Sequence, residues 1–292
     1  LRKIITIKYF SNYDFKRHLK PMMTFFIITI AVAFYVNVSV ALLGFIQGNE
    51  EVGYYNAAYR IKDVMVSIVT SLGAVLLPRL SYYIENNMWD KFNDILSKST
   101  QFIFILSLPL VAFCILFAKP SVLILAGSAY LGSIIPLQVL ALIIFIVGLS
   151  NLTGIQMLIP LKKEKYLCYS VVIAAVINMV LNLILIPEYG AIGAAVSVMV
   201  AEASILIYQI YILRAYSQVL FSGVSYMRII MALALAIIVS IWLNINLNYN
   251  ETIVFLVSAS LFFICYLGVL LLSKEPFIFT ILNQIRSKLT KN

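Results

Sequence analysis

Residues 178–202, NMVLNLILIPEYGAIGAAVSVMVAE, decide the fold of this chain, because two apolar runs meet here at the turn 187–190, Pro-Glu-Tyr-Gly. The runs extend over 166–186 and 191–213. Each has about 20 residues, the length that a helix rising about 1.5 Å per residue needs to cross a hydrocarbon core of about 30 Å. A turn this short can only join neighbouring antiparallel helices. The stretch therefore predicts a transmembrane hairpin.

The composition extends this interpretation to the whole chain. Of the 292 residues, 63% are hydrophobic and 11% are charged, whereas soluble domains are roughly 25% charged. We therefore expect a polytopic membrane protein with an all-α fold, a helical bundle. Long apolar runs predict eight membrane-spanning helices, at about 22–46, 53–77, 99–119, 134–158, 166–187, 190–213, 226–246 and 252–272.

The predicted spans divide the chain into four parts. We expect residues 1–20 to form a basic amphipathic cytoplasmic segment and residues 21–213 to form a six-span lobe. Residues 214–272 contain two additional spans, and 273–292 form a basic cytoplasmic tail. The eight spans thus make one lobe plus two extra C-terminal helices.

The basic residues outside the spans predict the orientation in the membrane. Eighteen Lys and Arg residues lie in the two ends of the chain and in the alternate loops, and the opposite loops contain only Lys119. Because cytoplasmic loops are enriched in Lys and Arg, we expect both ends of this chain to be cytoplasmic. The net charge of +9 therefore reflects topology, and we expect no nucleic-acid partner.

The second predicted span carries three charges, Arg60, Lys62 and Asp63. Charged side chains within a membrane are costly, so they should face protein or a wet cavity. Arg60 and Asp63 are spaced i, i+3 and can pair on one helical face. One acid cannot neutralise two bases, and a surplus positive charge suits an anionic ligand. We expect Arg60 and Lys62, with the neighbouring Tyr55 and Tyr59, to bind substrate.

The predicted hairpin contains three polar residues in its apolar runs. Glu202 is the only acid of the sixth span, and we expect it to have a coupling or structural role, as we do for Asp63. Asn178 and Asn182 are i, i+4 neighbours suited to hydrogen bonding between helices. The second and sixth spans also share an opening Gly-x-x-x-Ala-Ala, at 53–58 and 190–195, each after a short external turn that contains Glu.

No catalytic motif is visible, so we do not expect an enzyme. The single histidine, His18, lies outside the spans, and no GxxxxGK[ST] loop is present. Cys114, Cys168 and Cys265 lie in different apolar runs, which indicates buried thiols and neither a metal site nor a disulfide framework. We expect no resident cofactor. A membrane glycan polymerase or ligase is the less favoured alternative, because it would need a sizeable external loop.

Several stretches resemble a known family. GNEEVGYYNAAYRI, LGAVLLPRLS and INMVLNLILIPEYGAIGAAVSVMVAE are similar to the C-terminal part of polysaccharide-repeat (O-antigen, Wzx-type) flippases. These are members of the multidrug/oligosaccharidyl-lipid/polysaccharide exporter superfamily. The resemblance implies two helical lobes around a central cavity. Because the chain begins with Leu1, we expect that an N-terminal part with the first lobe is missing.

The resemblance also implies a function. It is the transport of undecaprenyl-pyrophosphate-linked oligosaccharide repeat units from the cytoplasmic to the outer leaflet, for surface polysaccharide synthesis, with a coupling ion, H⁺ or Na⁺. Membrane lipids and other polysaccharide assembly proteins would be its partners. The alternative in the same superfamily is a multidrug or small-molecule exporter. Many relatives have an Asp within N-x-D-x-x-x-L-G, where this chain has Ser39. The resemblance therefore does not imply, for this chain, an ion site that needs that acid. The sugar and the oligomeric state do not follow from the residues.

Overall fold

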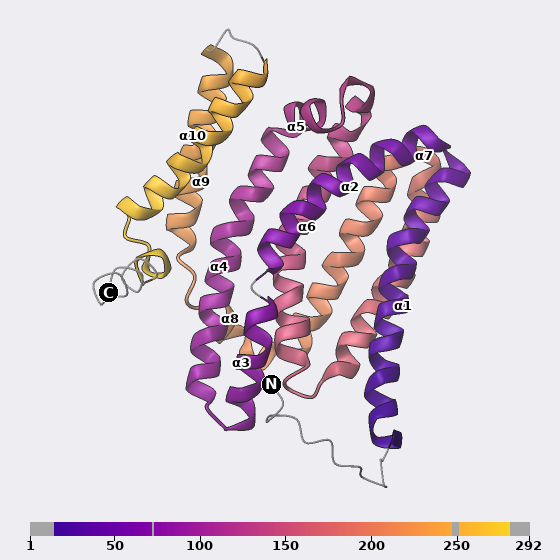
Figure 1. Ribbon diagram of the computed structural model, residues 1–292, viewed down its shortest axis with the longest axis vertical. Helices are drawn as coiled ribbons and strands as arrows, with labels where there is room; N and C mark the ends of the chain where they lie inside the picture. The colour runs from indigo at the N-terminus through magenta and orange to yellow at the C-terminus, as the bar shows by residue number, and fades with distance from the viewer. Residues whose placement is uncertain (1–14, 72, 247–250, 281–292) are drawn as a thin grey trace, which may run out of the picture.

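The computed structural model describes residues 15–71, 73–246 and 251–280, in which all regular elements are helical (Figure 1). The expectation of an all-α polytopic bundle is confirmed. The main helices are α1 (Phe15–Ile46), α2 (Asn49–Thr70), α3 (Gly73–Glu85), α4 (Trp89–Leu116), α5 (Ala118–Leu125), α6 (Ile134–Asn151), α7 (Glu164–Ile212), α8 (Ser217–Phe221), α9 (Tyr226–Asn246) and α10 (Glu251–Leu272). Short helical segments connect some of them, at Ser128–Ser133 (η1), Leu152–Leu158 (η2) and Arg214–Tyr216 (η3).

Seven helical stretches of the described residues are long and apolar enough to cross a membrane. One of them, α7, has 49 residues and contains both predicted helices of the hairpin, because it bends at Gly190, where φ is 51° and ψ is −127°. The seven stretches therefore overlap all eight predicted spans. The second predicted span, 53–77, includes the end of α2 at Thr70 and the beginning of α3 at Gly73.

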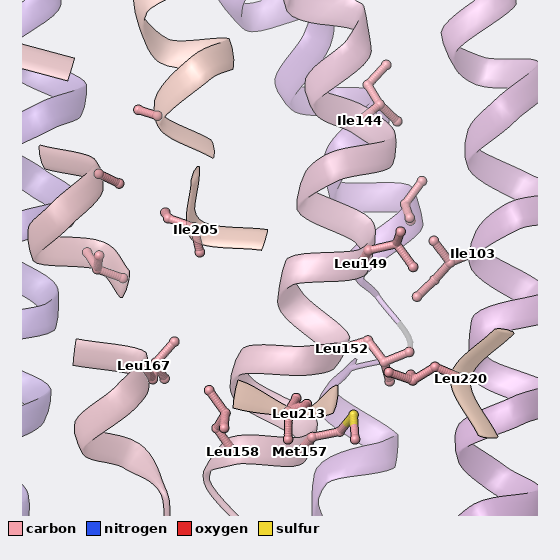
Figure 2. Close-up of a cluster of buried hydrophobic side chains, with 14 of the residues drawn as sticks. Ile103, Ile144, Leu149, Leu152, Met157, Leu158, Leu167, Ile205, Leu213 and Leu220 are labelled. Atoms are coloured by element: carbon pink, nitrogen blue, oxygen red, sulfur yellow. The ribbon is translucent and has the colours of Figure 1, made fainter. Parts of the chain in front are cut away.

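Helix α6 lies at the centre of the bundle, where it packs against α2, α4 and α7. It continues into η2, a π-helical segment whose side chains are mostly buried. Figure 2 shows part of the resulting core, in which Leu152, Met157 and Leu158 of η2 lie among apolar side chains of α4, α6, α7 and α8. α1 packs along α7 at one side of the bundle, and α9 and α10 pair at the other side, next to α4 (Figure 1).

The turn of the α7 hairpin is held by Gln47, which follows α1, and by Glu51 in the first turn of α2. The Gln47 side-chain amide donates to the carbonyl oxygens of Ile186 at 3.0 Å and Pro187 at 2.8 Å. Glu51 Oε2 accepts a hydrogen bond from the backbone N–H of Ala191 at 2.6 Å. Polar backbone groups at a helix break need such partners. The two turns at which the shared Gly-x-x-x-Ala-Ala patterns begin are therefore in direct contact.

The C-terminal helix pair is fixed to α4 at a proline. Pro109 lies inside α4 and has no N–H to donate to the carbonyl of Ile105, four residues earlier. The hydroxyl of Tyr266 in α10 donates to that carbonyl oxygen at 2.8 Å, and Tyr266 is buried. The tyrosine thus satisfies a carbonyl that the proline leaves free, and it ties α10 to the lobe.

Candidate functional site

Arg60 and Lys62, the two bases of α2, lie on different sides of the helix. Arg60 is exposed and borders a cavity of about 630 Å³ between α2 and the α5–η1 region. Asn56 and Tyr130 add polar groups to this cavity. The remaining lining residues are small or apolar, namely Gly53, Ala57, Ile61, Val64, Leu125 and Ala126. The cavity therefore offers an anion a guanidinium, an amide and a phenol in otherwise apolar surroundings.

Lys62 lies on the buried side of α2, with a relative exposure of 4%. Its Nζ is 3.6 Å from the centroid of the Tyr59 ring, an arrangement in which the ring face attracts the cation. Nζ is also 3.5 Å from Asp63 Oδ1. In this structure Lys62 is therefore enclosed by protein and does not line the cavity of Arg60.

The expected pairing of Arg60 with Asp63 is wrong. Within the described ranges Asp63 pairs with Lys62 instead. The physical reason is burial: a buried ammonium without an opposite charge is far more costly than an exposed guanidinium, which water can solvate. The guanidinium of Arg60 has no ion pair within the part of the chain that the structure describes.

Glu202 faces the same side as Lys62. Its Oε1 accepts a hydrogen bond of 2.8 Å from the hydroxyl of Tyr35 in α1, and its carboxylate acts electrostatically on Lys62. Tyr55, which is buried, packs against Tyr59 with ring centroids 5.8 Å apart. Residues of α1, α2 and α7 thus form one polar cluster, which we call the Lys62 cluster: Tyr35, Tyr55, Tyr59, Lys62, Asp63 and Glu202.

Asn178 and Asn182 belong to a second, separate group in α7. The Asn182 amide donates to Asn178 Oδ1 and to Ser39 Oγ, each at 2.9 Å, and Ser39 Oγ lies 3.3 Å from Asn178 Oδ1. All three side chains are fully buried. This group joins α1 to α7.

Tyr35 and Ser39 were not among the residues expected from the sequence. A weak signal for them exists, because they are polar residues spaced i, i+4 in an otherwise apolar run. Their partners are 139 to 167 residues away in the chain, so only the packing of α1 on α7 identifies them. In the described ranges no three His, Cys, Asp or Glu residues come close enough to hold a metal ion.

The comparisons with known proteins agree with one another. Residues 4–135 match the family described as "Polysaccharide biosynthesis protein". The chain is 27% identical over 192 residues to a protein assigned as an O-antigen transporter in Escherichia coli (strain K12), covering 66% of this chain and 46% of that protein. It is 25% identical over 169 residues to a protein assigned as a low-salt glycan biosynthesis flippase in Haloferax volcanii, covering 56% and 34%.

The fold has a close counterpart among solved structures. "Lipid II flippase MurJ, inward closed conformation" matches with a TM-score of 0.67 and 17% identity, covering 92% of this chain and 57% of that one. The chain spans about half the length of the E. coli relative. These matches confirm the resemblance to polysaccharide-repeat flippases, and the solved structure confirms the fold.

Proposed function

We propose that this chain, which resembles the polysaccharide-repeat flippases in sequence and fold, is part of a flippase for lipid-linked oligosaccharide. The substrate would be an undecaprenyl-pyrophosphate-linked repeat unit, moved from the cytoplasmic to the outer leaflet of a bacterial cytoplasmic membrane for surface polysaccharide synthesis. Alternating access between two lobes, coupled to H⁺ or Na⁺, would drive the movement. Other polysaccharide assembly proteins would supply and receive the lipid-linked unit.

One observation supports this proposal most: the guanidinium of Arg60, in a helical stretch that is apolar enough to cross a membrane, borders a cavity of about 630 Å³ and has no ion pair in the described ranges. An uncompensated cation within a membrane-spanning helix is costly unless it serves a ligand or faces water. A guanidinium also binds phosphate oxygens in a bidentate manner. Arg60 would therefore bind the pyrophosphate or an acidic sugar, while the apolar wall contacts uncharged parts of the substrate.

The remaining site residues do not line this cavity, so they would act on the substrate indirectly. Lys62 would add to the positive potential near the substrate, although its ammonium is enclosed between Tyr59 and Asp63. Tyr55 and Tyr59 would line the substrate path only in a conformation in which α2 moves, because Tyr55 is buried here. Asp63 and Glu202 would balance Lys62 or take part in ion coupling.

The test is export of surface glycan by the full-length protein carrying Arg60→Ala, with Arg60→Lys beside it. We expect Arg60→Ala to reach the membrane at the normal level and to stop export, while Arg60→Lys retains part of it because the charge remains. Arg79→Ala is the matched control, since Arg79 is exposed on α3 outside the cavity. It should export normally.

Two outcomes would overturn the proposal. Normal export by Arg60→Ala would remove Arg60 from substrate binding. A change in resistance to toxic small molecules, with unchanged surface glycan, would point instead to an exporter of small molecules.

A further inference from the structure

We infer that a small polar cavity between α2, α4 and α6 is a binding site for one monovalent cation of the size of Na⁺, held by neutral side-chain oxygens. The cavity is distinct from the one that Arg60 borders, since the two share no lining residue in the described ranges. A role of this cation in coupled transport rests on the function proposed above, but its binding does not.

The cavity lies inside the bundle, where three helical stretches that are long and apolar enough to cross a membrane pack together. It offers about 10 Å³ to the centre of a water-sized sphere, so it has room for one water molecule or one small ion. Among the described residues that line it, four are polar and the others are apolar or glycine. The polar four are Thr70 of α2, Ser99 of α4, Asn151 of α6 and Gln156 of η2.

Gln156 indicates that this cavity takes a ligand. Its side chain is 4% exposed, and within the described part of the chain its Oε1 is buried without a hydrogen-bond partner. The Nε2 of the same amide donates to Asn151 Oδ1 at 3.0 Å. Because a buried acceptor without a partner is costly, we expect a bound group that compensates Oε1.

The two hydroxyl groups are also available as acceptors. Thr70 Oγ1 and Ser99 Oγ each donate to the carbonyl oxygen four residues earlier in their own helix, at 3.0 Å and 2.7 Å. Each hydroxyl therefore keeps a lone pair for a further partner, as do the side-chain oxygens of Asn151 and Gln156. A water molecule has two hydrogens and can serve two of these four oxygens, whereas a cation attracts all four. This surplus of acceptors favours a cation over water.

The chemistry of the lining favours a monovalent ion. Oxygen ligands suit hard cations, and the absence of a carboxylate among the described lining residues disfavours a divalent one. Helix α2 ends at Thr70, and the C-terminal end of a helix has a partial negative charge that attracts cations. Helix C-termini and neutral oxygens bind Na⁺ in this way in other transporters.

The π-helical winding of η2 and a glycine in α3 shape the site. In an α-helix, residues five apart point about 140° away from each other. The i→i+5 bonding of a π-helix instead lets Gln156 meet Asn151. A Cβ at Gly73, the first residue of α3, would lie 2.7 Å from Gln156 Nε2 and 2.9 Å from Asn151 Oδ1. Glycine at this position therefore leaves the space that the two amides occupy.

The experiment is equilibrium binding of radioactive Na⁺ to the purified full-length protein. The melting temperature in NaCl and in choline chloride, at equal ionic strength, is the second readout. Gln156→Leu removes the unpartnered oxygen, and Thr70→Val and Ser99→Ala remove one hydroxyl each. Ser107→Ala is the matched control: Ser107 is also a buried serine of α4 that donates to the carbonyl four residues earlier, at 2.6 Å, but it does not line the cavity.

We expect saturable Na⁺ binding by the parent protein and a higher melting temperature in NaCl than in choline chloride, because a bound ion stabilises the folded state. Gln156→Leu should weaken Na⁺ binding by about tenfold or more, the effect of losing one buried polar partner. Thr70→Val and Ser99→Ala should weaken it in the same direction, and Ser107→Ala should leave it unchanged. The two hydroxyl variants keep the inference testable if Gln156→Leu does not fold.

Two results would overturn the inference. Equal melting temperatures in the two salts, without saturable Na⁺ binding, would show that the cavity holds only water. Parent-like Na⁺ binding in Thr70→Val, Ser99→Ala and any folded Gln156→Leu would place the bound ion elsewhere in the protein. Normal glycan export by Arg60→Ala would instead remove only the proposed function, because Na⁺ binding is measured without a substrate.

Discussion

Glu51 Oε2 accepts a 2.6 Å hydrogen bond from the backbone N–H of Ala191, which joins the first turn of α2 to the bend of α7. The carboxylate lies at the start of the second half of α7. There it satisfies a free donor and complements the positive end of the helix dipole. Gln47 satisfies the carbonyl groups on the other side of the bend. Two turns that are about 140 residues apart thus stabilise each other.

Replacing Glu51 by Ala should reduce stability by about 1 kcal/mol, the usual effect of losing a side-chain cap. The measurement is the melting temperature of the purified protein in detergent. Glu188→Ala is the control, because Glu188 is an exposed acid of the same turn for which no such bond is present. Equal melting temperatures for the two variants would contradict the capping role of Glu51.

Gly190→Ala should be more damaging than loss of the cap. The φ of Gly190 is 51°, and a Cβ there would collide with the Glu51 carboxylate. Strained backbone at such a position costs about 1–3 kcal/mol, to which the collision adds. Gly268→Ala in α10 is the matched control, since a Cβ at Gly268 meets no atom within 4 Å. The melting temperature should therefore fall clearly more in Gly190→Ala than in Gly268→Ala.

Tyr266→Phe should destabilise the docking of α10 on α4 by about 1–3 kcal/mol, because it leaves the buried carbonyl of Ile105 without a donor. In a Pro109→Ala background, Tyr266→Phe should reduce stability less, since the introduced alanine can donate its own N–H to the carbonyl oxygen of Ile105 within the helix. The non-additivity is measured by a double-mutant cycle on melting. Tyr189→Phe, at an exposed position, should have no effect. If the two substitutions reduced stability additively, the hydroxyl of Tyr266 would not be compensating for the N–H that Pro109 lacks.

Asn182→Ala should destabilise the contact between α1 and α7 by about 1–2 kcal/mol, because Ser39 Oγ and Asn178 Oδ1 lose a shared donor in a buried site. Asn244→Ala provides the comparison. The Asn244 amide donates to a carbonyl of its own helix, Ser240 O at 2.9 Å, so its loss should affect packing little. Hydrogen exchange along α1 would locate the effect. Equal protection in both variants would exclude a role of the Asn182 group in joining α1 to α7.

The spans and the hairpin could be predicted from the sequence because they depend on local properties. Apolar length sets which segments can cross a membrane. Pro187 and Gly190 mark the bend because of their own backbone chemistry. The end of α2 and the start of α3 were harder to predict from the sequence, because the stretch around Thr70 to Gly73 continues an apolar pattern that is typical of one helix. Hydropathy shows which segments suit a membrane, and it does not set where one helix ends and the next begins.

The candidate site was only half predictable for a related reason. The sequence placed Arg60, Lys62 and Asp63 at membrane depth, and membrane energetics required that they have partners or water. Spacing along α2 favoured Arg60 with Asp63, but the structure pairs Lys62 with Asp63. Which base is buried depends on how α2 is rotated against α1 and α7. The spacing of residues within one helix contains no information about that rotation.

The sequence by itself therefore determined a polytopic helical membrane protein, the positions of its candidate spans and the bend of its α7 hairpin. The tertiary structure alone decided that Tyr35 meets Glu202, that Ser39 joins Asn178 and Asn182, and that Arg60 borders a cavity while Lys62 is enclosed. The physical reason is that hydropathy and backbone preferences act within a segment. Hydrogen bonds and ion pairs between helices depend on the rotation and contact of segments far apart in the chain.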